Sequence, residues 1–456
     1  MARHKPLFYL LIIISIIAYA FIGYGVQRHE TAALFGFYFT LFAIYTWVIN
    51  TLTTKEVNYW LAVSLLFRVV LLFSIPTLSD DFYRFIWDGR LLANGLNPFI
   101  ELPDYYLESG HAVDGVDQYL FDHLNSKAYF TVYPPFSQII FWASAMLSPN
   151  SILGSVVVMR IFILAAEIGT LLLIRKLLPI FGLLPENILI YALNPLVILE
   201  LTGNLHFEAF VIFFLLLVIY FIYRSKVWQA GISMGLSIGA KLLPLILLPL
   251  FLMRIVWKRS VVFYVATGIT LLLLFIPLLN SEVIDGFSQS LGLYFNRFEF
   301  NASIYYLVRE YGFYAKGYNT IQTVGWKLGV ITLAGILIIS FWPYLFKRQD
   351  GKWKLIKRSK NINAWDEIPS VMMWVLFFYF LMTTTLHPWY LTTLLMLSLF
   401  TPYRFVIIWS AAVFLTYAGY GEYGFFENTY LVAVEYFLVI CYLVYELIWR
   451  RKYNYQ

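Results

Sequence analysis

Two adjacent carboxylates, Asp80 and Asp81, open a segment in which acidic, basic and aromatic residues alternate closely, SDDFYRFIWDGRLLANGLNPF. The pair follows directly after an apolar stretch. A carboxylate beside a second carboxylate at such a boundary can serve as a general base toward a hydroxyl group. A structural role is equally open, because Asp is a favoured N-cap and Asp80 precedes a short helical pattern. The two roles are compatible.

Further ionisable and aromatic residues could bind a sugar or a phosphate group. Cations stabilise phosphate, and aromatic faces stack on sugar rings. The candidates for donor phosphate or sugar binding are Arg84, Asp88, Arg90, His206, Glu208, Lys241, Arg297, His387 and Tyr390. They occur in separate motifs along the chain: the segment after Asp81, then GNLHFE, an apolar run around Lys241, an aromatic-rich segment at 290–319, and HPWY.

Each of these residues also has a structural explanation. His206 could bond a backbone carbonyl, and Glu208 could simply favour a helix N-terminus. Lys241 could snorkel or pair with Glu200 or Glu208. Tyrosines of 290–319 and the HPWY motif could form an aromatic belt or pack at an interface.

No spacing typical of a metal site or a bound cofactor is present. His206 and Glu208 are two residues apart, so on a helix their side chains diverge by roughly 200°. The chain has no Walker A motif and no dinucleotide-binding GxGxxG unit, which excludes an ATP-driven pump and disfavours a nucleotide-sugar enzyme. We therefore expect no cofactor, although a divalent metal on Asp80 and Asp81 is compatible with the pair.

The elements that carry these residues must lie in a membrane. Hydrophobic residues make up 61% of the 456 positions and charged residues only 13%. A soluble domain has about 25% charged residues. The net charge of +6 does not indicate nucleic-acid binding, because the basic residues occur in short clusters between apolar runs. The single cysteine, Cys441, excludes an internal disulfide.

The apolar runs predict an all-α polytopic membrane protein of about 12–14 transmembrane helices, each needing about 20 residues. The fourteen predicted spans are 7–25, 32–50, 57–77, 152–174, 187–203, 207–223, 228–241, 243–257, 261–279, 325–346, 370–386, 389–401, 404–420 and 430–449. The pair 228–241 and 243–257 could be half-helices that meet around Pro244.

Basic clusters set the expected orientation, because Lys and Arg concentrate in cytoplasmic loops. With both termini cytoplasmic, all the clusters fall inside, including the basic loop 347–369. Two long loops are then left outside, 78–151 with the acidic motif and 280–324. No large soluble unit interrupts the chain, so we expect 1–456 to be a single transmembrane domain.

The ordered motifs resemble a known superfamily. Asp80-Asp81-Phe82-Tyr83-Arg84, Trp87-Asp88-Gly89-Arg90, Asn97-Pro98, Tyr133-Pro134-Pro135, Asn194-Pro195, Gly203-Asn204-Leu205-His206-Phe207-Glu208 and His387-Pro388-Trp389-Tyr390 resemble GT-C integral membrane glycosyltransferases. The bacterial polyprenyl-phosphate-mannose-dependent mannosyltransferases are the most similar group. The resemblance covers about 57 to 400. Two features depart from it: two helices precede the acidic loop, and Asp81 stands where several relatives have Glu.

The resemblance implies a GT-C fold with short interfacial helices in the outer loops, and a catalytic aspartate at Asp80 or Asp81. It favours Asp80, since the first acid is the usual base. Mannose would move from a polyprenyl-phosphate donor to a glycan or glycolipid acceptor, with inversion and without an obligatory metal. Arg84, Lys241, and either Arg297 or His387 would neutralise the leaving phosphate. The expected location is a bacterial inner membrane, with the site facing the periplasm.

The alternative from a different class is a transporter or flippase of lipid-linked sugars. In that case the acidic loop would be a gate, and Lys241 with Glu200 a coupling site. Transport needs ionisable residues along a path through the bilayer. The sequence concentrates them at one interface, which favours an enzyme.

Overall fold

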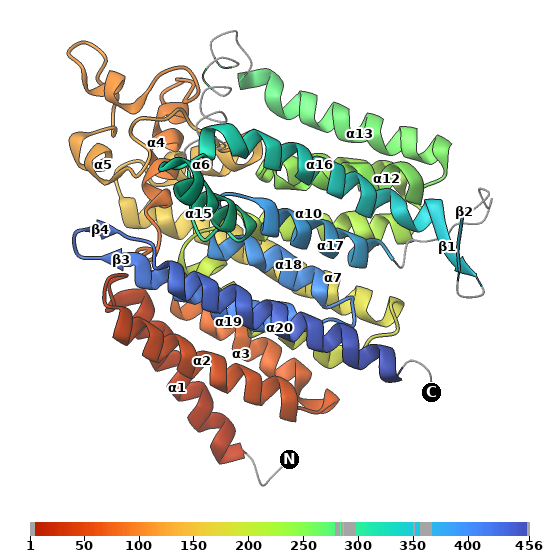
Figure 1. Cartoon of the computed structure of the whole chain (residues 1–456). Coiled ribbons are helices and arrows are strands. Elements are labelled where there is room, and N and C mark those ends of the chain that lie inside the picture. Colours follow the sequence, from red (N-terminus) through yellow and green to blue (C-terminus); the bar gives the residue numbers. More distant parts are fainter. Residues whose placement is uncertain are drawn as a thin grey trace.

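The computed structural model describes residues 5–278, 283, 286, 298–349, 352–355 and 367–453. These residues form an almost entirely helical bundle (Figure 1). The α-helices are α1 (Lys5–Tyr24), α2 (Thr31–Thr51), α3 (Val57–Val70), α4 (Asp81–Ala93), α5 (Gln118–His123), α6 (Pro135–Leu147), α7 (Ile152–Ile180), α8 (Ile188–Ala192), α9 (Pro195–Val197), α10 (Glu208–Tyr223), α11 (Val227–Ala240), α12 (Leu248–Arg254), α13 (Trp257–Phe275), α15 (Ile304–Lys316), α16 (Ile321–Leu345), α17 (Ile368–Met382), α18 (Leu391–Ser398), α19 (Phe405–Ala412) and α20 (Thr429–Tyr453).

Shorter turns and two small hairpins complete the described part of the chain. The 3₁₀ turns are η1 (Thr54–Glu56), η2 (Pro103–Leu107), η3 (Pro185–Asn187), η5 (Leu243–Leu247), η6 (Ile276–Leu278), η7 (Pro388–Tyr390) and η8 (Val413–Gly419), and η4 (Ile198–Gly203) is a π-helix. The antiparallel hairpins are β1 (Phe346–Gln349) with β2 (Lys352–Leu355), and β3 (Tyr420–Gly421) with β4 (Gly424–Phe425).

Six helices of the described chain are long and apolar enough to cross a membrane. They are Pro6–Tyr24, Thr31–Thr51, Ile152–Ile180, Trp257–Phe275, Ile321–Phe341 and Thr429–Ile448. A seventh candidate is the pair Pro195–Gly203 and Glu208–Tyr223, which bends by 113° at its break. The prediction of an all-α polytopic membrane protein is confirmed.

The predicted count of 12–14 exceeds these six or seven, although every predicted span falls on a helix or a run of short helices. The difference has a physical reason. Helices exposed to lipid must be continuous, because no water satisfies a broken backbone, whereas segments surrounded by protein can be short and irregular. The apolar window of α13 is only 22% buried, whereas every residue of α18 is buried.

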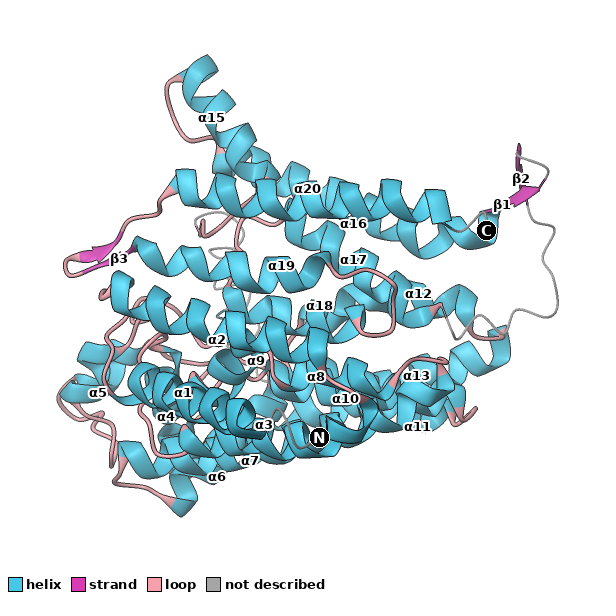
Figure 2. Ribbon diagram, turned by 90° about the horizontal axis from the view of Figure 1, so that it is seen from below, coloured by secondary structure: helices cyan, strands magenta, loops and turns pink. Residues whose placement is uncertain are grey.

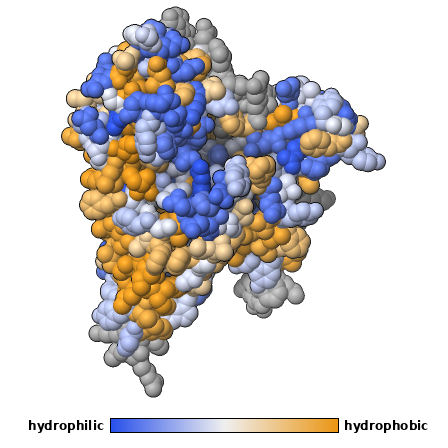
Figure 3. All heavy atoms as spheres, turned by 90° about the vertical axis from the view of Figure 1, so that its left-hand side faces the viewer, coloured by the Kyte–Doolittle hydropathy of each residue, from blue (hydrophilic) through white to orange (hydrophobic). Residues whose placement is uncertain are grey.

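The bundle has two unlike ends. Figure 1 shows α4, α5 and the β3–β4 hairpin at one end and β1–β2 with the C-terminus at the other, and Figure 2 agrees from a second direction. We call the first the α4 end. The acidic segment 78–151 folds there into α4, η2, α5 and α6. Figure 3 looks onto the α4 end, where hydrophilic residues gather around a hollow and hydrophobic residues cover the lower flank.

The close approach of α4 and α6 fixes the acidic segment on the bundle. A Cβ atom added at Gly89 of α4 would stand 2.2 Å from the carbonyl oxygen of Phe141 in α6. Only glycine allows this contact between backbones.

Arg160 of α7 holds the irregular segments beneath this end. Its buried guanidinium donates to the carbonyls of Leu72 and Ser74 after α3, at 2.7 Å each, and to those of Thr202 and Gly203 in the π-helix, at 2.7 and 2.8 Å. These carbonyls have lost helical partners, and one delocalised cation satisfies all four. Arg160 thereby ties the approach to Asp80 to the segment that carries His206.

Candidate active site

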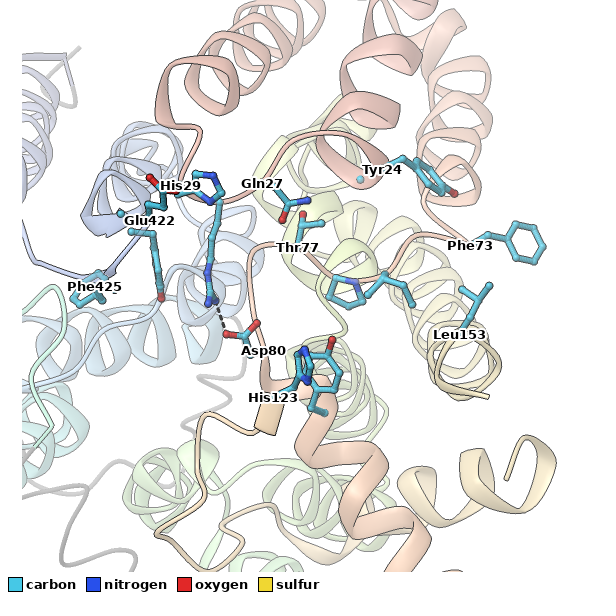
Figure 4. A pocket seen from close by; sticks show the side chains of 18 residues that line it. Tyr24, Gln27, His29, Phe73, Thr77, Asp80, His123, Leu153, Glu422 and Phe425 are labelled. Atoms are coloured by element: carbon cyan, nitrogen blue, oxygen red, sulfur yellow. Dashed lines mark ion pairs between the residues drawn. The ribbon is translucent and has the colours of Figure 1, made fainter. Parts of the chain in front are cut away.

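Asp80 lies at the N-cap of α4, but its side chain does not cap the helix. Its Oδ2 forms an ion pair of 2.6 Å with Nη1 of Arg28, and both side chains are about one-third exposed, at 33% and 32%. Figure 4 shows this pair on the wall of a pocket. The structural alternative raised by the sequence is thus not realised through a side-chain hydrogen bond.

Arg28 reaches Asp80 from the short link between α1 and α2. Its guanidinium carbon stands 4.9 Å from the ring centroid of Tyr420 in β3, in cation–π contact. Burial raises the pKa of Tyr420 to about 12 although Arg28 opposes the effect, so the phenol stays protonated. Three elements distant in sequence therefore meet at Asp80.

Asp81 faces a different set of groups. Its Oδ1 accepts a hydrogen bond of 2.7 Å from Nδ2 of Asn125, and its charge acts on the buried phenol of Tyr133. Burial and the Asp81 carboxylate raise the pKa of Tyr133 well above its usual value, so this phenol stays protonated. Asp81 also acts electrostatically on His387. The two carboxylates are thus adjacent in sequence but have separate partners.

Asp80 lines a cavity of about 740 Å³ at the α4 end. Its walls come from the α1–α2 link, the approach to α4, the start of α7 and the β3–β4 hairpin. In Figure 4, Tyr24, Phe73 and Leu153 lie on one side, whereas His29 and Glu422 lie on the other beyond Asp80. The cavity therefore has an aromatic and aliphatic side and a polar side.

Trp389 organises the aromatic part of the HPWY motif. The ring of His206 stacks on it with centroids 3.7 Å apart, and the ring of His387 lies parallel to it at 4.4 Å. Burial lowers the pKa of His387 to about 3, with Lys241 and His206 adding to the effect and Asp81 opposing it. His387 is therefore neutral at physiological pH, and its buried Nδ1 has no hydrogen-bond partner among the described residues.

The segment around Phe300 fixes the position of His387. Phe300 pairs with Thr385 as an isolated bridge: Phe300 N donates to Thr384 O at 3.1 Å, and Leu386 N donates to Phe300 O at 2.8 Å. The ring of Phe300 also packs against His387 at 4.6 Å.

His206 lies at the bend after the π-helix. Its Nε2 stands 3.4 Å from Oε2 of the buried Glu200, whose other oxygen accepts from Tyr417 at 2.6 Å. Leu205 before it has a φ of +61°, a left-handed conformation that is strained for a leucine. Such strain costs about 1–3 kcal/mol and clusters at functional sites.

Lys241 is the extended residue between α11 and η5, so the helix break begins three residues before the expected Pro244. Its ammonium pairs with Glu208 and lies 4.4 Å from the ring centroid of Tyr390. Glu208 is almost fully buried, and its Oε2 has no hydrogen-bond partner within the described chain. The predicted alternative of a Lys241–Glu208 pair is therefore present, while 25% of the Lys241 side chain remains exposed.

Arg84 and Asp88 form a buried network beside the site. Arg84 Nε pairs with Asp88 Oδ1 at 2.8 Å, and its Nη1 donates to the carbonyls of Ser126 and Tyr129. Asp88 Oδ2 accepts from Thr131 and Gln138. These partners use most of the bonding capacity of both groups, so the network joins α4 to the segment before α6.

Arg90 lies farther along α4 and donates through Nη1 to the carbonyl of Gly115. Burial lowers its pKa, while Asp117 and Asp114 oppose the effect. Arg297 lies outside the described residues.

Arg28 and Tyr420 were not among the residues predicted for this region, and Glu200, predicted only as a partner of Lys241, instead lies beside His206 and Tyr417. Arg28 carried a weak signal, because it is a basic residue in the link between the predicted spans 7–25 and 32–50. A cytoplasmic N-terminus places this link outside, against the usual charge bias. The i, i+4 spacing of Arg84 and Asp88 could have indicated their pairing. Among the described residues, no group of three or more His, Cys, Asp or Glu side chains could hold a metal ion.

Comparison with known proteins agrees with this architecture. Residues 13–257 match the family model described as alpha-(1→6)-mannopyranosyltransferase, N-terminal domain. The match spans the acidic segment, the bend at His206 and Lys241. No curated protein matches the chain significantly. Because the match covers more than half of its length, the chain belongs to the alpha-(1→6)-mannopyranosyltransferase family, a family of GT-C glycosyltransferases.

Proposed function

We propose that this membrane glycosyltransferase moves mannose from a polyprenyl-phosphate donor to an acceptor hydroxyl, with inversion and with Asp80 as general base. The main support for the proposal is that the two adjacent carboxylates have different surroundings. Asp80 is one-third exposed on the wall of a large cavity and has a single ion-pair partner, whereas Asp81 accepts a hydrogen bond from Asn125 and acts on the buried Tyr133 phenol.

The reaction is a single displacement. The acceptor oxygen attacks the anomeric carbon, the bond from that carbon to the phosphate oxygen breaks, and the phosphate leaves with the bonding electrons. Asp80 takes the proton of the acceptor hydroxyl. Positive charge develops on the sugar, as in other glycosyl reactions. A β-linked donor would give an α-linked product.

Lys241 is the best candidate to bind the leaving phosphate. It is partly exposed beside Tyr390, and Lys241 and His387 act on each other electrostatically. Neutral His387 could donate or accept a hydrogen bond through its unpartnered Nδ1. Tyr390, which is only partly buried beside Lys241, offers an aromatic ring for a sugar. Arg84 is less suited, because its Nε and Nη1 groups already bind Asp88 and two backbone carbonyls.

The basic clusters favour the cytoplasmic side, and this supports a site that faces the periplasm of a bacterial inner membrane. The scheme uses Lys241 for the phosphate charge and requires no cofactor. A divalent ion on the acidic pair is compatible with it and would be revealed by sensitivity of transfer to a chelator.

The test is transfer of radiolabelled mannose from polyprenyl-phosphate mannose to extracted membrane acceptors by purified protein. We expect Asp80→Asn to lower kcat by about 10²–10⁴-fold, the usual contribution of general-base catalysis. Asp104→Asn is the matched control, because Asp104 is an exposed carboxylate of the same segment. Transfer by a folded Asp80→Asn variant at the wild-type rate would exclude Asp80 as the base. Parallel glucose and arabinose donors test the sugar.

A further inference from the structure

The cavity beside Asp80 has no role in donor binding as described above. Within the described chain its lining includes Asp80 and Arg28 but not Asp81, Lys241 or His387. The carboxylate pair therefore separates two regions, one around Trp389 and Lys241 and one around Arg28.

The separation of the two regions matches what an inverting displacement requires. The attacking oxygen and the leaving oxygen lie on opposite faces of the anomeric carbon, so the base and the cation that binds the phosphate must also lie on opposite sides of the sugar. Arg28 is 2.6 Å from Asp80 and is therefore on the side of the base. It is wrongly placed for the leaving phosphate, whereas Lys241 belongs to the other region.

We propose that this cavity is the acceptor site, that it binds the sugar end of a glycan acceptor, and that Arg28 positions Asp80 toward that sugar. The proposal rests on the proposed function. It adds a binding site of about 740 Å³, a volume typical of small-ligand pockets.

The lining suits a sugar. Gln27, His29 and Glu422 supply side chains that can exchange hydrogen bonds with hydroxyl groups, and Tyr83 and Tyr420 supply aromatic rings. Arg28 is held between Asp80 and the ring of Tyr420, so the carboxylate is oriented before the acceptor arrives. Such preorganisation lowers the cost of reaching the reactive geometry.

The other side of the cavity bears on the kind of acceptor. Tyr24, Phe73 and Leu153 are 53%, 61% and 41% exposed, and Tyr24 and Leu153 belong to the ends of the membrane-spanning helices α1 and α7. A lipid anchor attached to the acceptor sugar could leave the cavity there. A soluble glycan would bind the polar side alone.

The experiment measures acceptor binding and transfer separately, with α-mannobiose and its octyl glycoside as probes. Gln27→Trp narrows the cavity at an exposed position and should preserve the fold. We expect it to weaken binding of both probes and to raise the acceptor KM at least 10-fold, while the donor KM stays unchanged. Gln229→Trp is the matched control, because Gln229 is an exposed residue of α11 and does not line the cavity.

A second variant pair tests Arg28. Arg28→Gln should lower kcat with little change in the donor KM, and Arg28→Lys should restore part of kcat. If the octyl glycoside binds more tightly than α-mannobiose, and Leu153→Trp abolishes this difference, the acceptor is lipid-anchored. Equal binding of both probes supports a soluble glycan end. Unchanged acceptor binding and acceptor KM in Gln27→Trp, or unchanged kcat in Arg28→Gln, would overturn the proposal. If neither the wild-type protein nor any variant transfers mannose, but Gln27→Trp binds the probes more weakly than the wild type, the proposed reaction fails and the sugar site stands.

Discussion

Replacing Lys241 by Met should reveal two separate effects, one on stability and one on transfer. Lys241 is the ion-pair partner of Glu208, whose side chain is only 1% exposed. Removing one member of a buried pair costs about 3–5 kcal/mol, because the remaining charge is left without compensation. Since 25% of the Lys241 side chain is exposed, water reaches this pair, and we expect a loss of about 3 kcal/mol.

The double variant Lys241→Met with Glu208→Gln separates the effects. Both charges are then absent, so the free energy of unfolding should return to within about 1 kcal/mol of the wild-type value. Transfer should not return. A charge-assisted hydrogen bond is worth about 1.5–3 kcal/mol, which corresponds to a loss of about 10- to 100-fold in kcat/KM for the donor.

Equilibrium unfolding in SDS and the mannose-transfer assay measure the two quantities on the same preparations. Lys176→Met, an exposed lysine of α7, is the control for loss of a positive charge. A double variant as unstable as Lys241→Met would show that the ion pair is not the source of the loss. A double variant that transfers mannose at the wild-type rate would remove Lys241 from phosphate binding.

Three further predictions concern the groups that support the site. Arg84→Met should lower the free energy of unfolding in SDS by about 3–5 kcal/mol. Adding Asp88→Leu should recover most of this loss, because no uncompensated buried carboxylate then remains. A donor KM that rises in both variants at full stability would instead indicate phosphate binding. Asn301→Ala should be less stable than Asn301→Gly by about 1 kcal/mol, since both lose the side-chain bond to Glu435 but alanine must also adopt a φ of +47°; equal stabilities would contradict this. Burial raises the pKa of Glu427 from 4.5 to about 7, so the folded state binds more protons than the unfolded state between these values, and stability should fall as pH rises from 5 to 8. Glu427→Gln should flatten this dependence in unfolding scans at the two pH values, and an unchanged slope would exclude Glu427 as its cause.

The class of fold was predictable because it depends on composition and on the length of apolar runs. Both are properties of single segments, and a lipid-facing helix such as α13 needs no partner to be identified. The interior was less predictable. Segments such as α18 are buried on all sides, so their apolar runs resemble membrane spans although the helices are much shorter. Length alone cannot separate the two cases when protein rather than lipid surrounds a helix.

The residues of the candidate site were also predictable only where the signal is local in the sequence. Asp80, Lys241 and His387 were found because each breaks a local pattern, as a charged or polar residue beside or within an apolar run. Arg28 carries only a weak signal and Tyr420 none, because their proximity to Asp80 depends on contacts between segments far apart in the chain. The roles of Asp88 and Arg84 were likewise not evident from residue type, because their partners lie in the segment before α6.

The buried charges of this protein fall into two kinds, and the difference bears on whether the bundle is an enzyme or a transporter. Arg68 and Glu167 are fully buried, and their charged groups are bonded to each other, to Tyr191 and to backbone carbonyls. A transport path would need such central groups to exchange partners during each cycle, at the high cost of leaving them unpaired in an apolar interior.

The groups around Trp389 are different. His206 Nε2, Glu208 Oε2 and His387 Nδ1 are buried atoms without a hydrogen-bond partner in the described part of the chain, and all three lie near one aromatic ring or the adjacent Lys241. Unpaired buried polar atoms are expensive, so their gathering at one end of the bundle favours a site that a polar ligand completes. A fixed core with an incomplete end is the arrangement expected of an interfacial enzyme that binds, reacts and releases at one membrane surface.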